Sequence, residues 1–156
     1  MTDYIELCDS LRSLISDVPH IQANLANASA LLFDRLPDLN WAGFYLFDGE
    51  NLVLNSFQGK PACIEIPLSR GVCGAAARSR ETLVVPDVHA FPGHIACDSA
   101  SNSEIVVPLI VSGRLFGVLD IDSPIFDRFG ESDRSGLENF AKILCFEIEK
   151  NRKGDK

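Results

Sequence analysis

The sequence predicts an α+β domain in which an antiparallel sheet carries helices grouped on one side. Three observations lead to this class. Apolar residues recur at helical spacing near both ends of the chain, over 5–18 and 131–153. Between these ends, short apolar segments are separated by turn residues, which is typical of β-hairpins. The length of 156 residues suits a single domain, 1–156, with one hydrophobic core.

The helices are expected at the ends of the chain. Residues 5–18 form an apolar stripe that includes Ile5 and Val18, and Pro19 ends this helix. A second helix is expected over 21–36. The last helix covers 131–153, with its own apolar stripe. Three helices therefore flank the segments that read as strands.

The strands are expected in two hairpins with shorter elements between them. The expected elements in chain order are strands 40–47 and 51–57, a short strand 62–68, the start of a helix 71–80, a strand 82–87, and strands 104–111 and 114–122 around Ser112–Gly113. The connection from Pro86 to Ser103 is long for such a domain. Long loops without structure of their own are often lids or binding loops.

Charge and hydropathy argue against two classes of partner, nucleic acid and a membrane. The formal net charge is −8, and no basic stripe of the kind a nucleic-acid binder needs is visible. No apolar run approaches the ~20 residues of a membrane helix. The opening residues MTDYIELCD lack the basic start and apolar core of a signal peptide. We therefore expect a cytoplasmic protein that binds neither nucleic acid nor a membrane.

The chain has five cysteines and no CxxC pair, so neither a secreted disulfide framework nor a zinc ribbon fits. In a reducing compartment, a disulfide is expected to be transient, catalytic or sensory. Cys8 and Cys145 lie on apolar helix stripes and are read as small core residues.

Three cysteines are candidates for chemistry. Cys97 lies in the stretch FPGHIACDSASNSEIVVPL, where its polar flanks predict an accessible thiol. Cys73 is at an expected helix start, where the helix dipole lowers a thiol pKa, although tight packing between glycines is the alternative. Cys63 opens the expected strand after Pro61, and a structural role is equally open to it.

A metal site is not expected. His94 and Cys97 have HxxC spacing and His89 is nearby, but structural zinc sites usually bring their ligands in two close pairs. We read both histidines as hydrogen-bonding residues of the loop.

Acidic residues gather on neighbouring strands. In 114–122, alternation places Phe116, Val118, Asp120 and Asp122 on one face. Like charges this close raise at least one pKa, which leaves a carboxyl able to donate a proton. Solvation of both acids at a turn is the alternative. Because the hairpin turns at Ser112–Gly113, Glu104 is expected near Asp122.

The first hairpin offers an aromatic pair. Trp41, Gly43 and Tyr45 share a face, and Gly43 is expected to leave a gap in which a ligand could lie. Ordinary core packing is the alternative.

Five motifs together resemble the free methionine-(R)-sulfoxide reductases, a family of stand-alone GAF domains. The motifs are NWAGFYL, FQGKPAC (with Pro61 as a departure from the family pattern), RGVCG, the stretch from GHIACD to SNSEIV, and GVLDIDS, and the match runs over about 24–129. The resemblance implies a six-stranded antiparallel sheet and reduction of the free amino-acid sulfoxide to methionine. It implies no metal or organic cofactor, thioredoxin as electron donor, and packing of helices into a homodimer.

The resemblance also implies roles for individual residues. It makes Cys97 the nucleophile, Cys63 the resolving thiol and Cys73 a third redox cysteine used in recycling. The effect of a helix start on the thiol pKa, taken alone, favours Cys73 as the nucleophile instead. The implied substrate-binding residues are the acids Glu104, Asp120 and Asp122 and the aromatic wall of Trp41 and Tyr45.

Two other functions are compatible with the sequence. One is a GAF module that senses a ligand, and the other is a redox switch whose thiols only report oxidant. Catalytic turnover distinguishes the enzyme from both.

Overall fold

The computed structural model describes residues 1–95 and 97–154. The last two residues of the predicted domain, 155–156, lie outside the described residues. The secondary-structure elements of the described chain, in order, are α1 (Tyr4–Ile15), α2 (Ile21–Arg35), β1 (Trp41–Phe47), β2 (Asn51–Gly59), β3 (Glu65–Pro67), α3 (Gly71–Ser79), β4 (Leu83–Val85), the short 3-10 helix η1 (Val88–Ala90), β5 (Ser103–Val111), β6 (Arg114–Ser123) and α4 (Glu131–Gly154).

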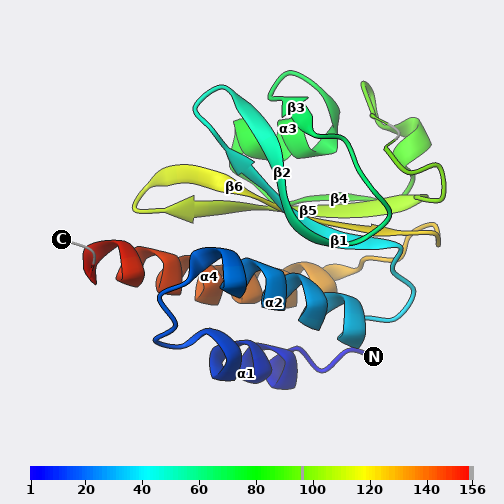
Figure 1. The fold of residues 1–156 in the computed structure, drawn as a ribbon. Helices are drawn as coiled ribbons and strands as arrows, with labels where there is room; N and C mark the ends of the chain where they lie inside the picture. The colour runs from blue at the N-terminus through cyan, green and yellow to red at the C-terminus, as the bar shows by residue number, and fades with distance from the viewer. Residues whose placement is uncertain (96, 155–156) are drawn as a thin grey trace.

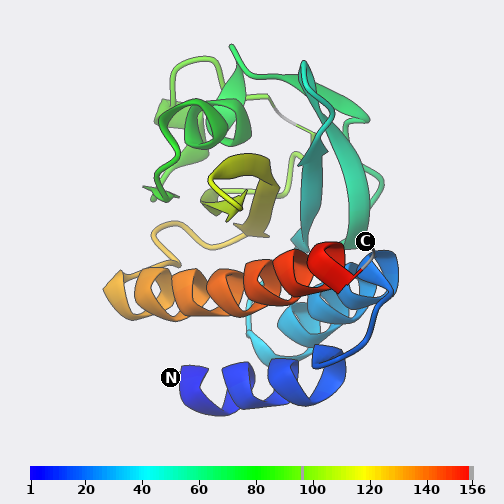
Figure 2. The same cartoon turned by 90° about the vertical axis from the view of Figure 1, so that its left-hand side faces the viewer.

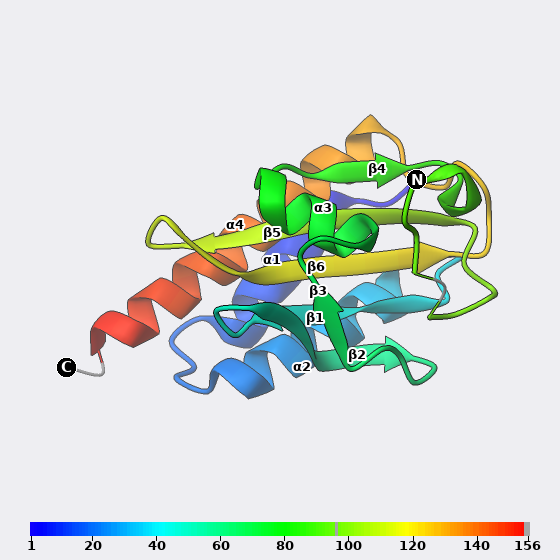
Figure 3. The ribbon, with the colours of Figure 1, turned by 90° about the horizontal axis from the view of Figure 1, so that it is seen from above.

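The strands form one antiparallel sheet in the order β3-β2-β1-β6-β5-β4 (Figure 3). Helices α2 and α4 lie on one face of the sheet with α1 packed beneath them on the same side, and α3 lies on the other face (Figures 1 and 2). The predicted α+β class, with N- and C-terminal helices on one side, is therefore confirmed. None of the helices in the described part of the chain is long and apolar enough to cross a membrane.

The two faces of the sheet carry separate hydrophobic clusters. Ala42 and Phe44 of β1 point toward the helices α1, α2 and α4 and join the larger cluster. Trp41 and Tyr45 of the same strand join a smaller cluster beneath α3. This alternation follows from the strand geometry, which sends successive side chains to opposite faces. The smaller cluster forms the floor on which the site is built.

Aspartate side chains hydrogen-bond to backbone amides where α1 and α4 begin. Helix α1 begins after Asp3, whose carboxylate accepts a hydrogen bond from the Glu6 amide, and it ends at Ile15, before the expected Val18. Ile5, expected on the apolar stripe, is instead 79% exposed. At α4, the Asp133 carboxylate accepts from the Gly130 amide at 2.9 Å. Asp133 thus satisfies a backbone donor at the start of this helix.

Strands β3 and β6 differ from the sequence-based expectation in ways that affect the site. Strand β3 begins at Glu65, so Cys63 lies in the loop before it. In β6, the pairing with β5 shifts between Leu109 and Ile110, which leaves Phe116 as an extra residue. Phe116 consequently packs with the helix-side cluster, and its predicted place on the face of Asp120 is wrong.

Candidate active site

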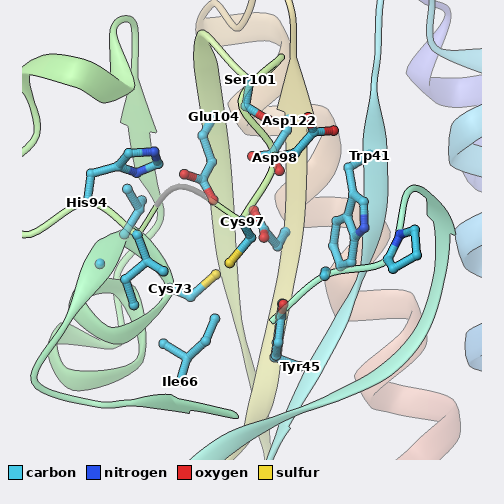
Figure 4. A pocket seen from close by; sticks show the side chains of 16 residues that line it. Trp41, Tyr45, Ile66, Cys73, His94, Cys97, Asp98, Ser101, Glu104 and Asp122 are labelled. Atoms are coloured by element: carbon cyan, nitrogen blue, oxygen red, sulfur yellow. The ribbon is translucent and has the colours of Figure 1, made fainter. Parts of the chain in front are cut away.

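A pocket of about 550 Å³, including its open mouth, lies on the α3 side of the sheet (Figure 4). Its walls come from β1, β5 and β6, the N-terminal turn of α3, and the loops before β3 and β5. The predicted site residues that line it are Trp41, Tyr45, Cys73, Cys97, Glu104, Asp120 and Asp122. Residues spread over more than 80 positions of the sequence, from 41 to 122, thus meet in one cavity.

The remaining predicted site residue, Cys63, reaches the pocket through a disulfide. Cys63 and Cys97 are joined across 34 positions of sequence, with their Cα atoms 5.7 Å apart. The loop of Cys63 is held from β1, because the Tyr45 hydroxyl donates to the Cys63 carbonyl at 2.9 Å and the Trp41 indole donates to the Lys60 carbonyl at 3.1 Å. The aromatic pair therefore also holds the loop that carries one sulfur of the disulfide.

Strand register brings the three carboxyls together. Glu104 of β5 pairs directly with Asp122 of β6, as the position of the hairpin turn predicted. Glu104 and Asp120 are each only 6% exposed. Neither acid of β6 lies in a turn, since the strand continues to Ser123, so the alternative of two acids solvated at a turn is wrong.

Burial dominates the electrostatics of these acids. Desolvation raises the pKa of Glu104 and of Asp122 well above their ordinary values, and the neighbouring Asp120 adds to both shifts. The pKa of Asp120 is also raised by burial, although hydrogen bonds from Glu104 and Cys73 oppose the rise. Among the described residues that line the pocket there is no lysine or arginine. The pocket therefore favours a ligand that brings a positive charge or accepts a proton.

The expectation that a helix start activates Cys73 is wrong. Cys73 is 4% exposed, and its pKa is raised well above the ordinary value by desolvation and then by Asp120 and Glu104. The helix dipole favours a thiolate by only a modest amount, whereas full burial beside carboxyls disfavours it strongly. Cys73 is thus a protonated thiol in the wall of the pocket.

The aromatic wall is packed more tightly than predicted. Trp41 stacks on Tyr45 with ring centroids 5.9 Å apart, and on Phe57 at 5.2 Å. Phe57 lies opposite Gly43, where an added Cβ would approach the Phe57 Cβ to 2.3 Å. The expected ligand gap at Gly43 is therefore filled by Phe57. The pocket lies instead on the side of Trp41 and Tyr45 that faces Cys97.

Sequence reasoning missed a residue that holds the loop of Cys97. The Asn40 side-chain amide donates to Asp98 Oδ2 at 3.0 Å and to Ser101 Oγ at 2.9 Å, and its backbone amide donates to the Asp122 carbonyl at 3.0 Å. Asp98 and Ser101 both line the pocket. The sequence did contain a signal for Asn40, namely a polar residue placed directly before an apolar strand. His89 does bond within the loop as expected, since its Nε2 lies 2.9 Å from Asn102 Oδ1.

We expect Asn40→Ala to lower the rate of the reaction at Cys97 by roughly 100-fold, because small misplacements of reacting groups have effects of that size. The loss of two side-chain hydrogen bonds should lower the free energy of unfolding by only about 1–2 kcal/mol. The measurement is the rate of Cys97 oxidation, compared with chemical denaturation. Asn55→Ala is the matched control, since the hydrogen bonds of the Asn55 side chain within the described part of the chain run to the adjacent Ser56. Equal oxidation rates in the two variants would exclude this positioning role.

Comparisons with known proteins agree with this geometry. The sequence pattern of the GAF domain family matches residues 20–148. A protein of Escherichia coli (strain K12) named free methionine-R-sulfoxide reductase is 53% identical over 90% of this chain and 86% of its own length. The Saccharomyces cerevisiae protein of the same name is 48% identical over 78% of this chain and 72% of its own.

A solved structure supports the same family. The X-ray structure of free methionine-R-sulfoxide reductase from Neisseria meningitidis, in complex with its substrate, superposes with a TM-score of 0.93. It is 46% identical, and the superposition covers 97% of this chain and 91% of that one. The chain therefore belongs to the GAF domain family and, within it, to the free methionine-R-sulfoxide reductases.

Proposed function

We propose that this protein reduces free L-methionine-(R)-sulfoxide to L-methionine, with Cys97 as the nucleophile and Cys63 as the resolving thiol. One observation carries the proposal: the Cys63–Cys97 disulfide adjoins a pocket whose described lining residues include four carboxyls, three of them clustered on β5 and β6, and no lysine or arginine. The handedness of the sulfoxide follows from the names of the relatives.

In the first step, the Cys97 thiolate attacks the sulfoxide sulfur while a buried carboxyl donates a proton to the oxygen. The protonated oxygen then passes from the substrate sulfur to the Cys97 sulfur. The sulfoxide S–O bond and the sulfur–sulfur bond made in the attack both break, methionine leaves, and Cys97 becomes a sulfenic acid. The sulfoxide gains the two electrons that Cys97 loses. Because burial raises the pKa of Glu104 and Asp122, one of them is suited to remain protonated near neutral pH.

In the second step, the Cys63 thiol attacks the sulfenic sulfur, and the oxygen leaves as water. The product is the disulfide that the structure contains. Thioredoxin, an external dithiol, then reduces it by exchange through a mixed disulfide. We assign Cys73 to this recycling rather than to the attack, since burial raises its pKa.

The remaining contacts of the substrate follow from charge and shape. The ammonium group of the free amino acid pairs with the ionised carboxylate of the cluster, and the S-methyl group lies against Trp41 and Tyr45. This chemistry needs no metal or organic cofactor. Thioredoxin as donor places the reaction in the cytoplasm, and we propose a homodimer through the helices, where Ile5 and Phe146 are exposed.

The deciding experiment is a coupled assay with thioredoxin, thioredoxin reductase and NADPH. Sustained NADPH oxidation that depends on free methionine sulfoxide is expected. A redox switch would consume a single equivalent per chain, and a ligand-sensing GAF module would consume none.

Specificity for the free amino acid can be tested with blocked substrates. We expect N-acetyl-methionine-(R)-sulfoxide to react at least roughly 100-fold more slowly than the free form, because a buried carboxylate loses its cationic partner. Turnover of the separated (R) and (S) epimers, free and N-acetylated, is the measurement. Comparable rates for the free and acetylated (R) epimers would refute the ammonium contact.

A further inference from the structure

We propose that the pocket also binds one Zn²⁺ ion, through Cys73, Glu104 and Asp120, and that the ion inhibits the enzyme. The inhibition rests on the proposed function. The binding does not, because it depends only on the arrangement of the three side chains.

The three side chains offer ligand atoms at metal-site spacing. Cys73 Sγ, one Glu104 carboxylate oxygen and one Asp120 carboxylate oxygen all lie within 4.8 Å of one another. Zinc bonds of about 2.0–2.3 Å at the tetrahedral angle place ligand atoms roughly 3.3–3.7 Å apart, which is inside this limit. The ligands come from α3, β5 and β6, so their spacing in the sequence gives no metal motif. They also differ from the HxxC pair considered in the sequence.

A second observation favours a cation at this position. Asp120 is 94% buried, and its Oδ1 atom has no hydrogen-bond partner among the described residues, although it belongs to the lining of the pocket. A buried acceptor without a partner costs free energy. Because no lysine or arginine of the described chain lines the pocket, a cation bound by the Asp120 carboxylate would neutralise the cluster and supply the positive charge that the lining lacks.

The donor set selects the type of cation. A thiolate together with two carboxylates suits Zn²⁺ or Cd²⁺, whereas Mg²⁺ and Ca²⁺ prefer oxygen ligands alone. Three protein ligands leave the fourth tetrahedral position for water.

Metal binding by these three ligands does not require that Cys97 be reduced. The three ligands lie together in the same structure that holds the Cys63–Cys97 disulfide. Zinc can therefore bind the oxidised protein. An ion held there also occupies the carboxylates proposed for the substrate, so it should compete with methionine sulfoxide.

The test of binding uses the oxidised, metal-free protein. Titration with Zn²⁺ in a calorimeter should give one site per chain, and Cd²⁺ should give an ultraviolet thiolate-to-metal charge-transfer band. The band should vanish in Cys73→Ser. Asp120→Asn should weaken binding by more than the roughly 10- to 100-fold typical of outer-sphere partners. Cys8→Ser, which alters another buried helix cysteine, should leave both signals unchanged.

Several results would overturn the proposal: no zinc bound by the oxidised wild type, an intact Cd²⁺ band in Cys73→Ser, or displacement of Zn²⁺ by equimolar Mg²⁺. A thermal unfolding scan of each apo variant identifies any that fail to fold, and for those Cys73→Ala and Asp120→Ala replace them. Inhibition is measured separately, as a Zn²⁺-dependent rise in KM in single turnovers of pre-reduced protein. Zinc binding without any sulfoxide reduction would refute the proposed function alone, and reduction without zinc binding would refute this inference alone.

Discussion

Cys97→Ser is expected to abolish methionine formation, including the first turnover of pre-reduced protein without an external reductant. Serine cannot supply a thiolate, and we place no other thiol in the attack. Burial raises the pKa of Cys73, and Cys63 lies outside the described lining of the pocket. The measurement is methionine released per chain after rapid mixing with excess sulfoxide. Wild type should release about one equivalent.

Cys63→Ser separates attack from resolution. This variant should still release one methionine, and it should accumulate a sulfenic acid on Cys97 that a cyclic diketone can trap. Cys145→Ser is the control, since Cys145 lies on α4, away from the pocket. Retention of the burst in Cys97→Ser, together with its loss in Cys73→Ser, would transfer the nucleophile role to Cys73.

Asp122→Asn and Glu104→Gln should lower kcat/KM for free methionine sulfoxide by roughly 100- to 10,000-fold, the usual contribution of a general acid. Stability should behave differently. Burial raises the pKa of both carboxyls, so the folded state disfavours their ionised forms above the unfolded pKa. An amide removes that cost. The free energy of unfolding at neutral pH should therefore stay constant or rise.

Glu65→Gln is the matched control, because Glu65 is exposed on the edge strand β3. It should change neither activity nor the urea midpoint. A urea midpoint that falls in parallel with activity in the two pocket variants would show that the acids serve the fold rather than the chemistry.

The sequence by itself determined the elements whose cause is local. The two short apolar segments 40–47 and 51–57 predicted the β1–β2 hairpin, and the position of Ser112–Gly113 placed Glu104 opposite Asp122. Turn residues and alternation act over a few positions, so they can be read directly. The motifs also identified the family, because this chain keeps them over most of its length.

Only the tertiary structure decided the environment of each side chain. It fixed the loop of Cys63 through hydrogen bonds from Trp41 and Tyr45, filled the space beside Gly43 with Phe57, and buried Cys73 of α3 against carboxyls from two strands. These outcomes depend on contacts between residues distant in the sequence, and on the desolvation that those contacts cause. A helix start favours a thiolate at Cys73, but burial reverses that preference because the cost of removing a charge from water exceeds the effect of a helix dipole.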